Sequence, residues 1–200
     1  MNTTTTRALV AAAALTIGLA LPGCSASTST SSDASSTESA SSASSHDDQD
    51  VTFTQQMLPH HQQAIEMSAT LLAKGTGVDA DVVALAKQIT AEQEPEVTKM
   101  TEWLTAWNEP TEMPSTSGMD HSSMSGMMSD SDVRDLQDAS AEDAGKLYLE
   151  QMVQHHSSAV AMAKAEVDKG KNVDAVALAR SIVAGQTEQI AQMKDMLASM

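Results

Sequence analysis

Several features that would point to common protein functions are scarce or absent in this sequence of 200 residues. Cys24 is the only cysteine, so the chain cannot build an internal disulfide framework. Only 11 residues are Lys or Arg against 27 Asp or Glu, and the formal net charge of −16 argues against nucleic acid and anionic lipid surfaces as partners. Such an acidic surface concentrates cations, although it can equally serve solubility alone.

Two absences concern the fold and its chemistry. No useful length of the chain alternates polar and apolar residues with a period of two, so strands are not expected. No histidine completes a Glu-x-x-His motif, which a di-iron helical bundle requires, so a di-iron enzyme is not favoured. A copper-oxidising enzyme has no positive support in the sequence either. We therefore expect a protein without catalytic activity.

The amino-terminal region indicates export. Arg7 precedes an apolar run over 8–21 that is too short to span a bilayer and is typical of a signal peptide. The run ends in Leu21-Pro22-Gly23-Cys24, which resembles a bacterial lipobox and predicts lipidation of Cys24, although Pro22 departs from the usual small residue. We assign 1–23 to the signal peptide and 24–49, which is mostly Ser and Thr, to a flexible tether.

The rest of the chain, 50–200, contains an internal repeat. The segment MLPHHQQAIEM at 57–67 recurs as MVQHHSSAVAM at 152–162, and the downstream residues 84–100 match 177–193. We expect repeat one over 50–108, a Met/His-rich loop over 109–131, and repeat two over 132–200. Each repeat predicts a helical hairpin, so the expected fold is all-α, a four-helix bundle.

Helix boundaries follow from local capping signals. The first helix should begin near Asp50 or Thr52 and stop at Gly75, and Asp79 or Asp81 should cap the second. The third should follow Ser140 and end near Gly170, with an earlier start near Asp132 as the alternative, and the fourth should run from about Asp174 to the end. Pro95 predicts a kink or break in the second helix near residues 92–94.

The repeated motif places soft and nitrogen ligands on one helical face. Thioethers select Cu(I), and imidazole serves both oxidation states of copper, so Met and His together favour copper over zinc or iron. The alternative is plain packing, because methionine often fills gaps in a core. Two neighbouring buried histidines are costly without a partner, which favours a metal site. The candidate ligands in the bundle are Met57, His60, His61, Met67, Met152, His155, His156 and Met162.

The loop between the repeats offers a second candidate site. It is rich in methionine in a Gly/Ser background without apolar periodicity, so we do not expect these methionines to belong to the core. The interpretation is a low-coordinate Cu(I) site, with sacrificial oxidation as the alternative. The candidate ligands are Met119, His121, Met124, Met127 and Met128.

Gln93 and Gln186 interrupt the inner stripes of the second and fourth helices at equivalent positions. A buried amide needs hydrogen-bond partners, and the histidines are the obvious candidates. We therefore expect either that these amides support the histidines or that they are exposed at the edge of the apolar face.

With these motifs in place, Phe53, MLPHHQQAIEM and the downstream pattern of Ile89, Gln93, Met100 and Trp103 resemble the family known as domain of unknown function 305. The resemblance covers about 50–200. It implies an exported, often lipid-anchored helical protein of ferritin-like bundle type, and some members are associated with copper binding and resistance. Val153-Gln154 and the lack of a terminal Trp depart from the family pattern in the second repeat.

The sequence therefore predicts a copper-binding protein outside the cytoplasm, at the membrane outer face through Cys24 or in the periplasm. It would sequester copper or hand it to a transfer partner and support copper tolerance, with Cu(I) favoured and Cu(II) the alternative. The competing hypotheses are a structural or partner-binding bundle without metal and, less favoured, a metal-dependent redox enzyme.

Overall fold

The computed structural model describes residues 45–111 and 126–200, and this part of the chain is all-helical. Its helices are α1 (Asp48–Ala73), α2 (Ala80–Trp107), α3 (Asp130–Asp138), α4 (Ala141–Lys169) and α5 (Val173–Ser199). The all-α prediction is confirmed. The short helix α3 adds an element where the sequence offered only an earlier start of the third helix near Asp132.

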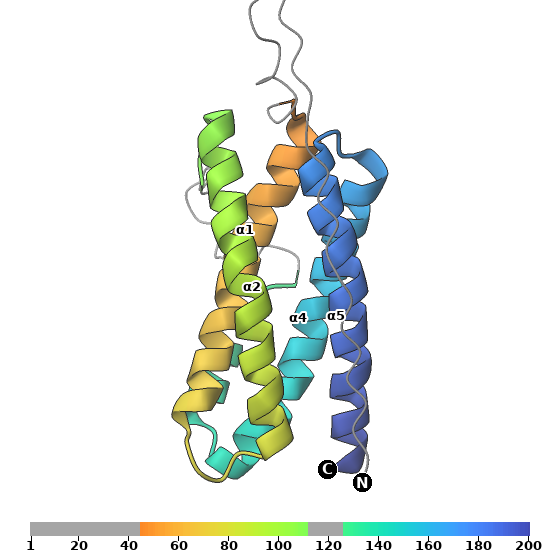
Figure 1. Cartoon of the computed structure of the whole chain (residues 1–200). Coiled ribbons are helices and arrows are strands. Elements are labelled where there is room, and N and C mark those ends of the chain that lie inside the picture. Colours follow the sequence, from red (N-terminus) through yellow and green to blue (C-terminus); the bar gives the residue numbers. More distant parts are fainter. Residues whose placement is uncertain (1–44, 112–125) are drawn as a thin grey trace, which may run out of the picture. The chain divides into compact units, whose positions relative to one another are not determined.

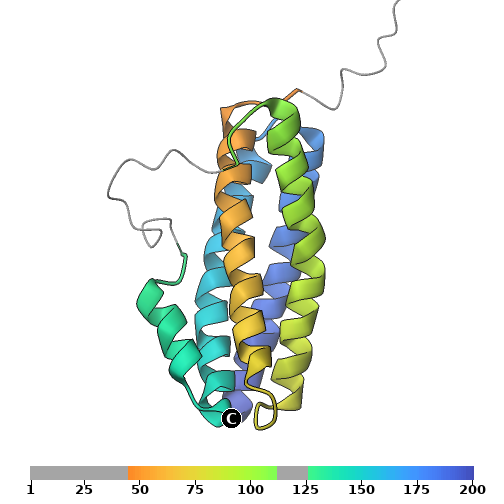
Figure 2. The ribbon, with the colours of Figure 1, turned by 90° about the vertical axis from the view of Figure 1, so that its left-hand side faces the viewer.

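The four long helices form a bundle made of two antiparallel hairpins, α1 with α2 and α4 with α5 (Figure 1). The hairpins meet mainly through α1 and α4, which run in opposite directions. Helix α3 lies on the outside of the bundle, against α1 and α4 (Figure 2), and its Leu136 is buried in the core. The central pair α1 and α4 therefore carries the repeated Met and His motif of both halves.

Polar side chains fix the helix ends where the sequence placed them. Asp79 caps α2, Ser140 caps α4 and Asn172 caps α5, each by accepting backbone N–H groups of the first turn. Gly75 follows the end of α1 with φ of +69°, a conformation that favours glycine. The helix starts and stops are thus encoded locally.

Helix α2 continues through Pro95 from Ala80 to Trp107, so of the predicted kink or break near 92–94 the break does not occur. Helix α1 likewise contains Pro59 without interruption. A proline inside a helix costs on the order of 3 kcal/mol. Burial of Ile89 and Met100 on either side of Pro95 offsets that cost, because both anchor the same helix face in the core.

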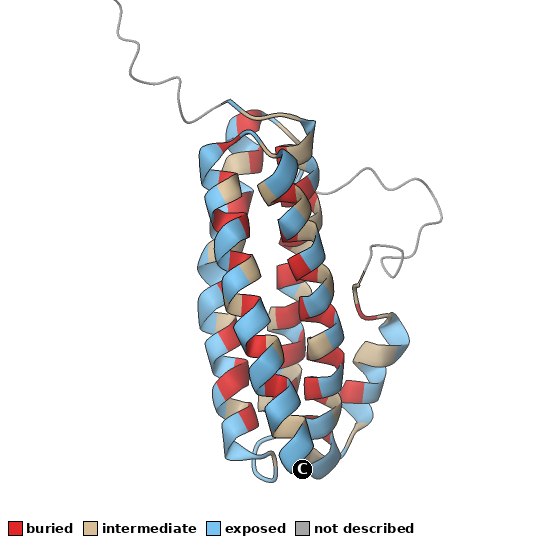
Figure 3. Cartoon of the chain, turned by 90° about the vertical axis from the view of Figure 1, so that its right-hand side faces the viewer, coloured by how far each residue is buried: buried red, intermediate tan, exposed pale blue. Residues whose placement is uncertain are grey.

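The buried residues line the inner faces of the long helices, while the outward faces are exposed (Figure 3). They form two hydrophobic clusters. One contains Met67, Leu71, Ile89, Tyr148 and Met152, and the other contains Phe53, Met57, Met100, Ala159 and Ile182. Along both α1 and α4, the paired histidines fall between residues of one cluster and residues of the other.

Candidate metal centre

A layer of four histidines crosses the centre of the bundle; His60 and His61 come from α1, and His155 and His156 come from α4. All four side chains are buried, with exposed fractions of 0–1%. The rings of His60 and His155 face each other across the two helices, with centroids 3.6 Å apart and an interplanar angle of 35°. The antiparallel pairing of α1 and α4 brings the two motif copies together in this way. We call these four residues the histidine layer.

The hydrogen bonds of Ser158 decide which nitrogen of His60 carries its proton. The Ser158 hydroxyl donates to the backbone carbonyl of His155 at 2.7 Å, and its oxygen lies 2.8 Å from Nε2 of His60. Because the hydroxyl proton is already used, Nε2–H of His60 must donate to Oγ. The lone pair of neutral His60 is therefore on Nδ1.

The second histidine of each pair is also held through Nε2. His61 donates to Oε2 of Glu96 at 2.7 Å, and His156 donates to Oε1 of Gln189 at 2.8 Å. The Gln189 amide in turn donates to Oε2 of Glu92 at 2.8 Å, which fixes the orientation of that amide because a carboxylate only accepts. Both contacts leave the lone pair of the histidine on Nδ1.

The histidine layer therefore contains several buried atoms without hydrogen-bond partners. Among the described residues, no partner is found for Nδ1 of His60, His61 and His156 or for either ring nitrogen of His155. A buried polar atom normally has a partner, and leaving one unpaired costs about 1–3 kcal/mol. The same lack of hydrogen-bond partners in both histidine pairs favours a ligand that accepts lone pairs from nitrogen.

Burial keeps the imidazoles of His60, His155 and His156 neutral. Burial, together with the neighbouring His61 and His156, lowers the pKa of His60 to about 3. Burial also lowers the pKa of His156 to about 4 and holds the pKa of His155 well below its usual range. Neutral imidazole is the form that binds metal, so these groups are available as ligands at neutral pH.

Methionines of both repeats lie on either side of the histidine layer. Met67 and Met152 share one hydrophobic cluster, while Met57 belongs to the other and half-buried Met162 packs against it. Each side therefore receives one thioether from each repeat. Across the part of the chain that the structure covers, no three His, Cys, Asp or Glu side chains form a metal-holding group, so a site here would combine imidazole with thioether.

The loop candidates divide between residues that are described and residues that are not. Met119, His121 and Met124 lie outside the described residues, as does Cys24. Met127 is half-buried, and Met128 is 4% exposed and packs in the cluster with Met67 and Met152. The expectation that no loop methionine belongs to the core was wrong for Met128, because two hydrogen bonds between its backbone and the Gln63 amide dock this segment on α1.

The expected support of the histidines by Gln93 and Gln186 is not what the structure shows. Both amides are buried, but Oε1 of each has no partner among the residues described. The supporting residues are Glu96 and Gln189, which lie three positions further along each helix and occupy equivalent positions in the two repeats. Ser158 and Glu92 were also missed. The repeat alignment paired Glu96 with Gln189, but apolar periodicity alone did not place either on the inner face.

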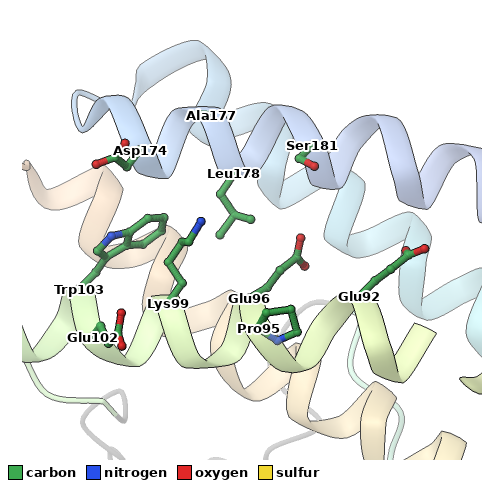
Figure 4. Close-up of a pocket in the computed structure, with 10 residues that line it drawn as sticks. All are labelled: Glu92, Pro95, Glu96, Lys99, Glu102, Trp103, Asp174, Ala177, Leu178 and Ser181. Carbon is green, nitrogen blue, oxygen red and sulfur yellow. The ribbon is translucent and has the colours of Figure 1, made fainter. Parts of the chain in front are cut away.

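A groove between α2 and α5 lies directly outside Glu92 and Glu96 (Figure 4). It has a volume of about 670 Å³. The side chains of Glu92, Glu96 and Lys99 extend from α2 toward α5 in this view. The remaining lining residues are Pro95, Glu102, Trp103, Asp174, Ala177, Leu178 and Ser181. Glu96, which bonds His61, and Glu92, which bonds Gln189, thus both line a groove that is open to solvent.

The chain is similar to a known protein family and to several solved structures. The sequence profile of Domain of unknown function (DUF305) matches residues 50–197. A DUF305 fragment from Deinococcus radiodurans is 32% identical, with a TM-score of 0.69, and the match covers 78% of this chain and 99% of that one. A DUF305 protein from Streptomyces coelicolor, named as secreted, is 33% identical over 76% of this chain and 93% of its own, with a TM-score of 0.68.

A further similar structure is CopM in its Cu(I)-bound form, which is 27% identical over 75% of this chain and 96% of that one, with a TM-score of 0.61. CopM has also been crystallised with Cu(II). A search of curated proteins gave no match. In the part of the chain that is described, no helix is both long enough and apolar enough to cross a membrane.

Proposed function

This chain belongs to the DUF305 family. Because its histidine layer contains buried ring nitrogens without hydrogen-bond partners among the described residues, we propose that the protein binds copper outside the cytoplasm. The observation that carries the proposal is the set of buried ring nitrogens without hydrogen-bond partners in the histidine layer. Likeness to CopM, whose structures hold Cu(I) and Cu(II), supports copper as the ion. The proposed role is to sequester copper or pass it to a transfer protein, which supports copper tolerance and requires no catalytic step.

Within the bundle, the proposed ligands are imidazole nitrogens and thioethers. His60 and His155 face each other, and each carries a free lone pair on a buried nitrogen. Methionines from both repeats lie on either side, and thioethers favour Cu(I). We propose that the copper ligands in the bundle are drawn from the imidazoles of His60, His61, His155 and His156 and the thioethers of Met57, Met67, Met152 and Met162.

A second class of site is proposed in the Met/His-rich segment, with Met119, His121 and Met124 as ligands and half-buried Met127 beside them. Met128 is a weaker candidate than its neighbours, because its side chain is already packed in the core. Lipidation of Cys24 would hold the bundle at the outer face of the membrane, and the Ser/Thr-rich tether would connect the two. Mass measurement of the mature amino terminus tests the lipidation.

The test of the bundle site is an anaerobic Cu(I) titration against a competing chelator. All proteins should carry Met119→Ala, His121→Ala and Met124→Ala, so that the segment between the repeats does not contribute. We expect H60L/H155L to lose Cu(I) binding that the parent protein retains. The matched control is M100L/M193L, because these two core methionines are equally buried but lie outside the repeated motif.

The outcomes separate copper binding from a purely structural bundle. Loss of binding in H60L/H155L but not in M100L/M193L supports the proposal. Equal copper stoichiometry in all three proteins would show that the histidine layer is not the site. Absence of Cu(I) binding in the parent and in the unmodified chain would favour a structural or partner-binding bundle.

A further inference from the structure

We propose that Glu96, acting through His61, shifts the copper preference of the bundle toward Cu(II), whereas Gln189, acting through His156, adds no such shift. Both residues are positioning residues, since each acts through the histidine that it holds. The inference rests on the proposed copper site. It concerns the oxidation state that the site prefers and not whether copper binds.

The geometry sets up a direct comparison between two equivalent contacts. Glu96 and Gln189 occupy the same position in the two repeats, and each accepts a hydrogen bond from Nε2 of the second histidine of its pair, at 2.7 and 2.8 Å. Both histidines are fully buried, and both keep an unpartnered Nδ1 among the described residues. The two contacts differ in charge: one acceptor is a carboxylate and the other is a neutral amide.

A carboxylate bonded to the far nitrogen of a ligating imidazole orients the ring and makes the other nitrogen a stronger donor. Its negative charge also stabilises a bound cation, and this Coulomb interaction is twice as large for Cu(II) as for Cu(I) at the same distance. An amide orients the ring without adding charge. Glu96 should therefore raise affinity for Cu(II) more than for Cu(I).

The second repeat has a carboxylate one step further away. Glu92 accepts hydrogen bonds from Gln189 at 2.8 Å and from Gln88 at 2.9 Å, so its charge is separated from His156 by an amide. Glu92 belongs to α2, and the equivalent position in α5 is Gly185, which has no side chain to offer. Both carboxylates thus come from the first repeat, and only Glu96 contacts a histidine directly.

The experiment measures Cu(II) and Cu(I) dissociation constants of the full mature chain by chelator competition, with His121→Ala in every protein. E96Q should weaken Cu(II) binding by about 10- to 100-fold, the usual effect of losing such a supporting residue. Its effect on Cu(I) should be about tenfold smaller, which corresponds to a rise in the copper reduction potential of about 59 mV. E96Q keeps the shape of the side chain and its acceptor oxygen.

Two further proteins sharpen the test. E92Q/Q189E moves a carboxylate onto His156 while avoiding two adjacent carboxylates, and it should strengthen Cu(II) binding relative to Cu(I). E102Q is the matched control, because Glu102 lines the same groove and its loss changes net charge equally. We expect E102Q to leave the ratio of the two affinities within about twofold of the parent, since screening weakens exposed charges.

The results that would overturn this inference differ from those that would overturn copper binding itself. If E96Q weakens both oxidation states equally or neither, or if E102Q matches E96Q, then Glu96 does not determine the preference. If the parent protein binds neither ion in the bundle, the proposed function fails and this inference fails with it.

Discussion

Two buried polar parts of the bundle, Asp50 and the histidine layer, differ in whether the described residues supply their hydrogen-bond partners. At the end of the bundle, the fully buried Asp50 carboxylate accepts backbone N–H groups of Asp47, Lys171 and Asn172 at 2.7–3.0 Å. In the histidine layer, ring nitrogens of the same degree of burial have no partner among the described residues. We call Asp50 together with its buried neighbour Glu166 the carboxyl pair; the hydrogen bonds of this pair are those of Asp50, because no partner is found among the described residues for either carboxyl oxygen of Glu166.

This difference separates a structural role from a binding role. The carboxyl pair links the start of α1 to the turn between α4 and α5, and nearly every acceptor position of Asp50 is used by the fold itself. The histidine layer leaves lone pairs that none of the described residues uses. A buried polar cluster that is costly on its own, yet built twice from a repeated motif, is better explained by a ligand than by stability.

The largest predicted effect is a loss of stability of the metal-free protein in mild acid. The pKa values of His60 and His156 are lowered to about 3 and 4, and that of His155 is also lowered, whereas unfolded histidine has a pKa near 6.5. Stability is therefore complete above pH 6.5 and is lost as pH falls toward the folded-state values. Each histidine contributes about 1.4 kcal/mol per pH unit.

The raised pKa of Glu166 has the opposite effect, because its contribution to stability grows as pH falls through this range. Glu166 therefore offsets the loss from about one of the three histidines, and the net loss of stability is about 3 kcal/mol per pH unit. Urea unfolding at pH 7.0, 6.0 and 5.0 in the presence of a chelator measures the loss. H155L should show a shallower dependence, since one titrating group is gone. A midpoint that stays constant between pH 7.0 and 5.0 would contradict the assignment of neutral buried histidines.

Asp50→Ala should have the next largest effect, a loss of about 3 kcal/mol in the free energy of unfolding. The substitution removes the acceptor of three backbone N–H groups, and each buried unpaired group costs about 1–3 kcal/mol. Urea unfolding at pH 7 checks this value. Asp48→Ala is the matched control, because Asp48 is an exposed acid in the same first turn and should change stability by less than about 1 kcal/mol.

Most of the fold follows from local features of the sequence. Asp79, Ser140 and Gly170 mark helix ends by capping chemistry, and the repeat fixes two similar hairpins. Pro95 does not break α2. The sequence shows the local cost of the proline, but not the packing of side chains further along the helix that offsets it. Helix α3 is short and mainly polar, and Leu136 is its only buried residue, so no apolar stripe in the sequence predicts it as a separate helix.

The site was predictable only in part. The two His-His pairs and their methionines follow from the repeat, and the antiparallel order of α1 and α4 then brings His60 to His155. The partners Glu96, Gln189 and Ser158 could not be found, because a hydrogen bond between helices depends on how the helices rotate against one another. Gln93 and Gln186 interrupt the apolar stripe and so attract attention in the sequence, whereas Glu96 and Gln189 lie one turn further along each helix without such a signal.

Bound copper should stabilise the folded protein by somewhat less than Asp50→Ala destabilises it, and this tests the binding role of the histidine layer directly. A ligand held at 100 times its dissociation constant adds about 2.7 kcal/mol to the free energy of unfolding. H155L should lose this gain while its metal-free form is at least as stable as the parent, because both ring nitrogens of His155 lack partners in the described structure. Anaerobic urea unfolding with and without Cu(I) measures both quantities. A metal-free H155L protein that is strongly destabilised would mean that His155 has a structural role.

The smallest predicted effect concerns Glu166 and distinguishes the two clusters by the sign of their pH dependence. Burial raises the pKa of Glu166 to about 8, with the adjacent Asp50 carboxyl adding to the rise. A raised acid pKa means that the folded protein keeps a proton that the unfolded chain releases, so the contribution is complete below pH 4.5 and is lost as pH rises toward 8. E166Q cannot ionise and should remove this dependence. Between pH 6.5 and 8.0 the parent should lose about 1.7 kcal/mol more than E166Q, measured by urea unfolding. Parallel curves would show that folded Glu166 does not keep a proton that the unfolded chain releases in this pH range.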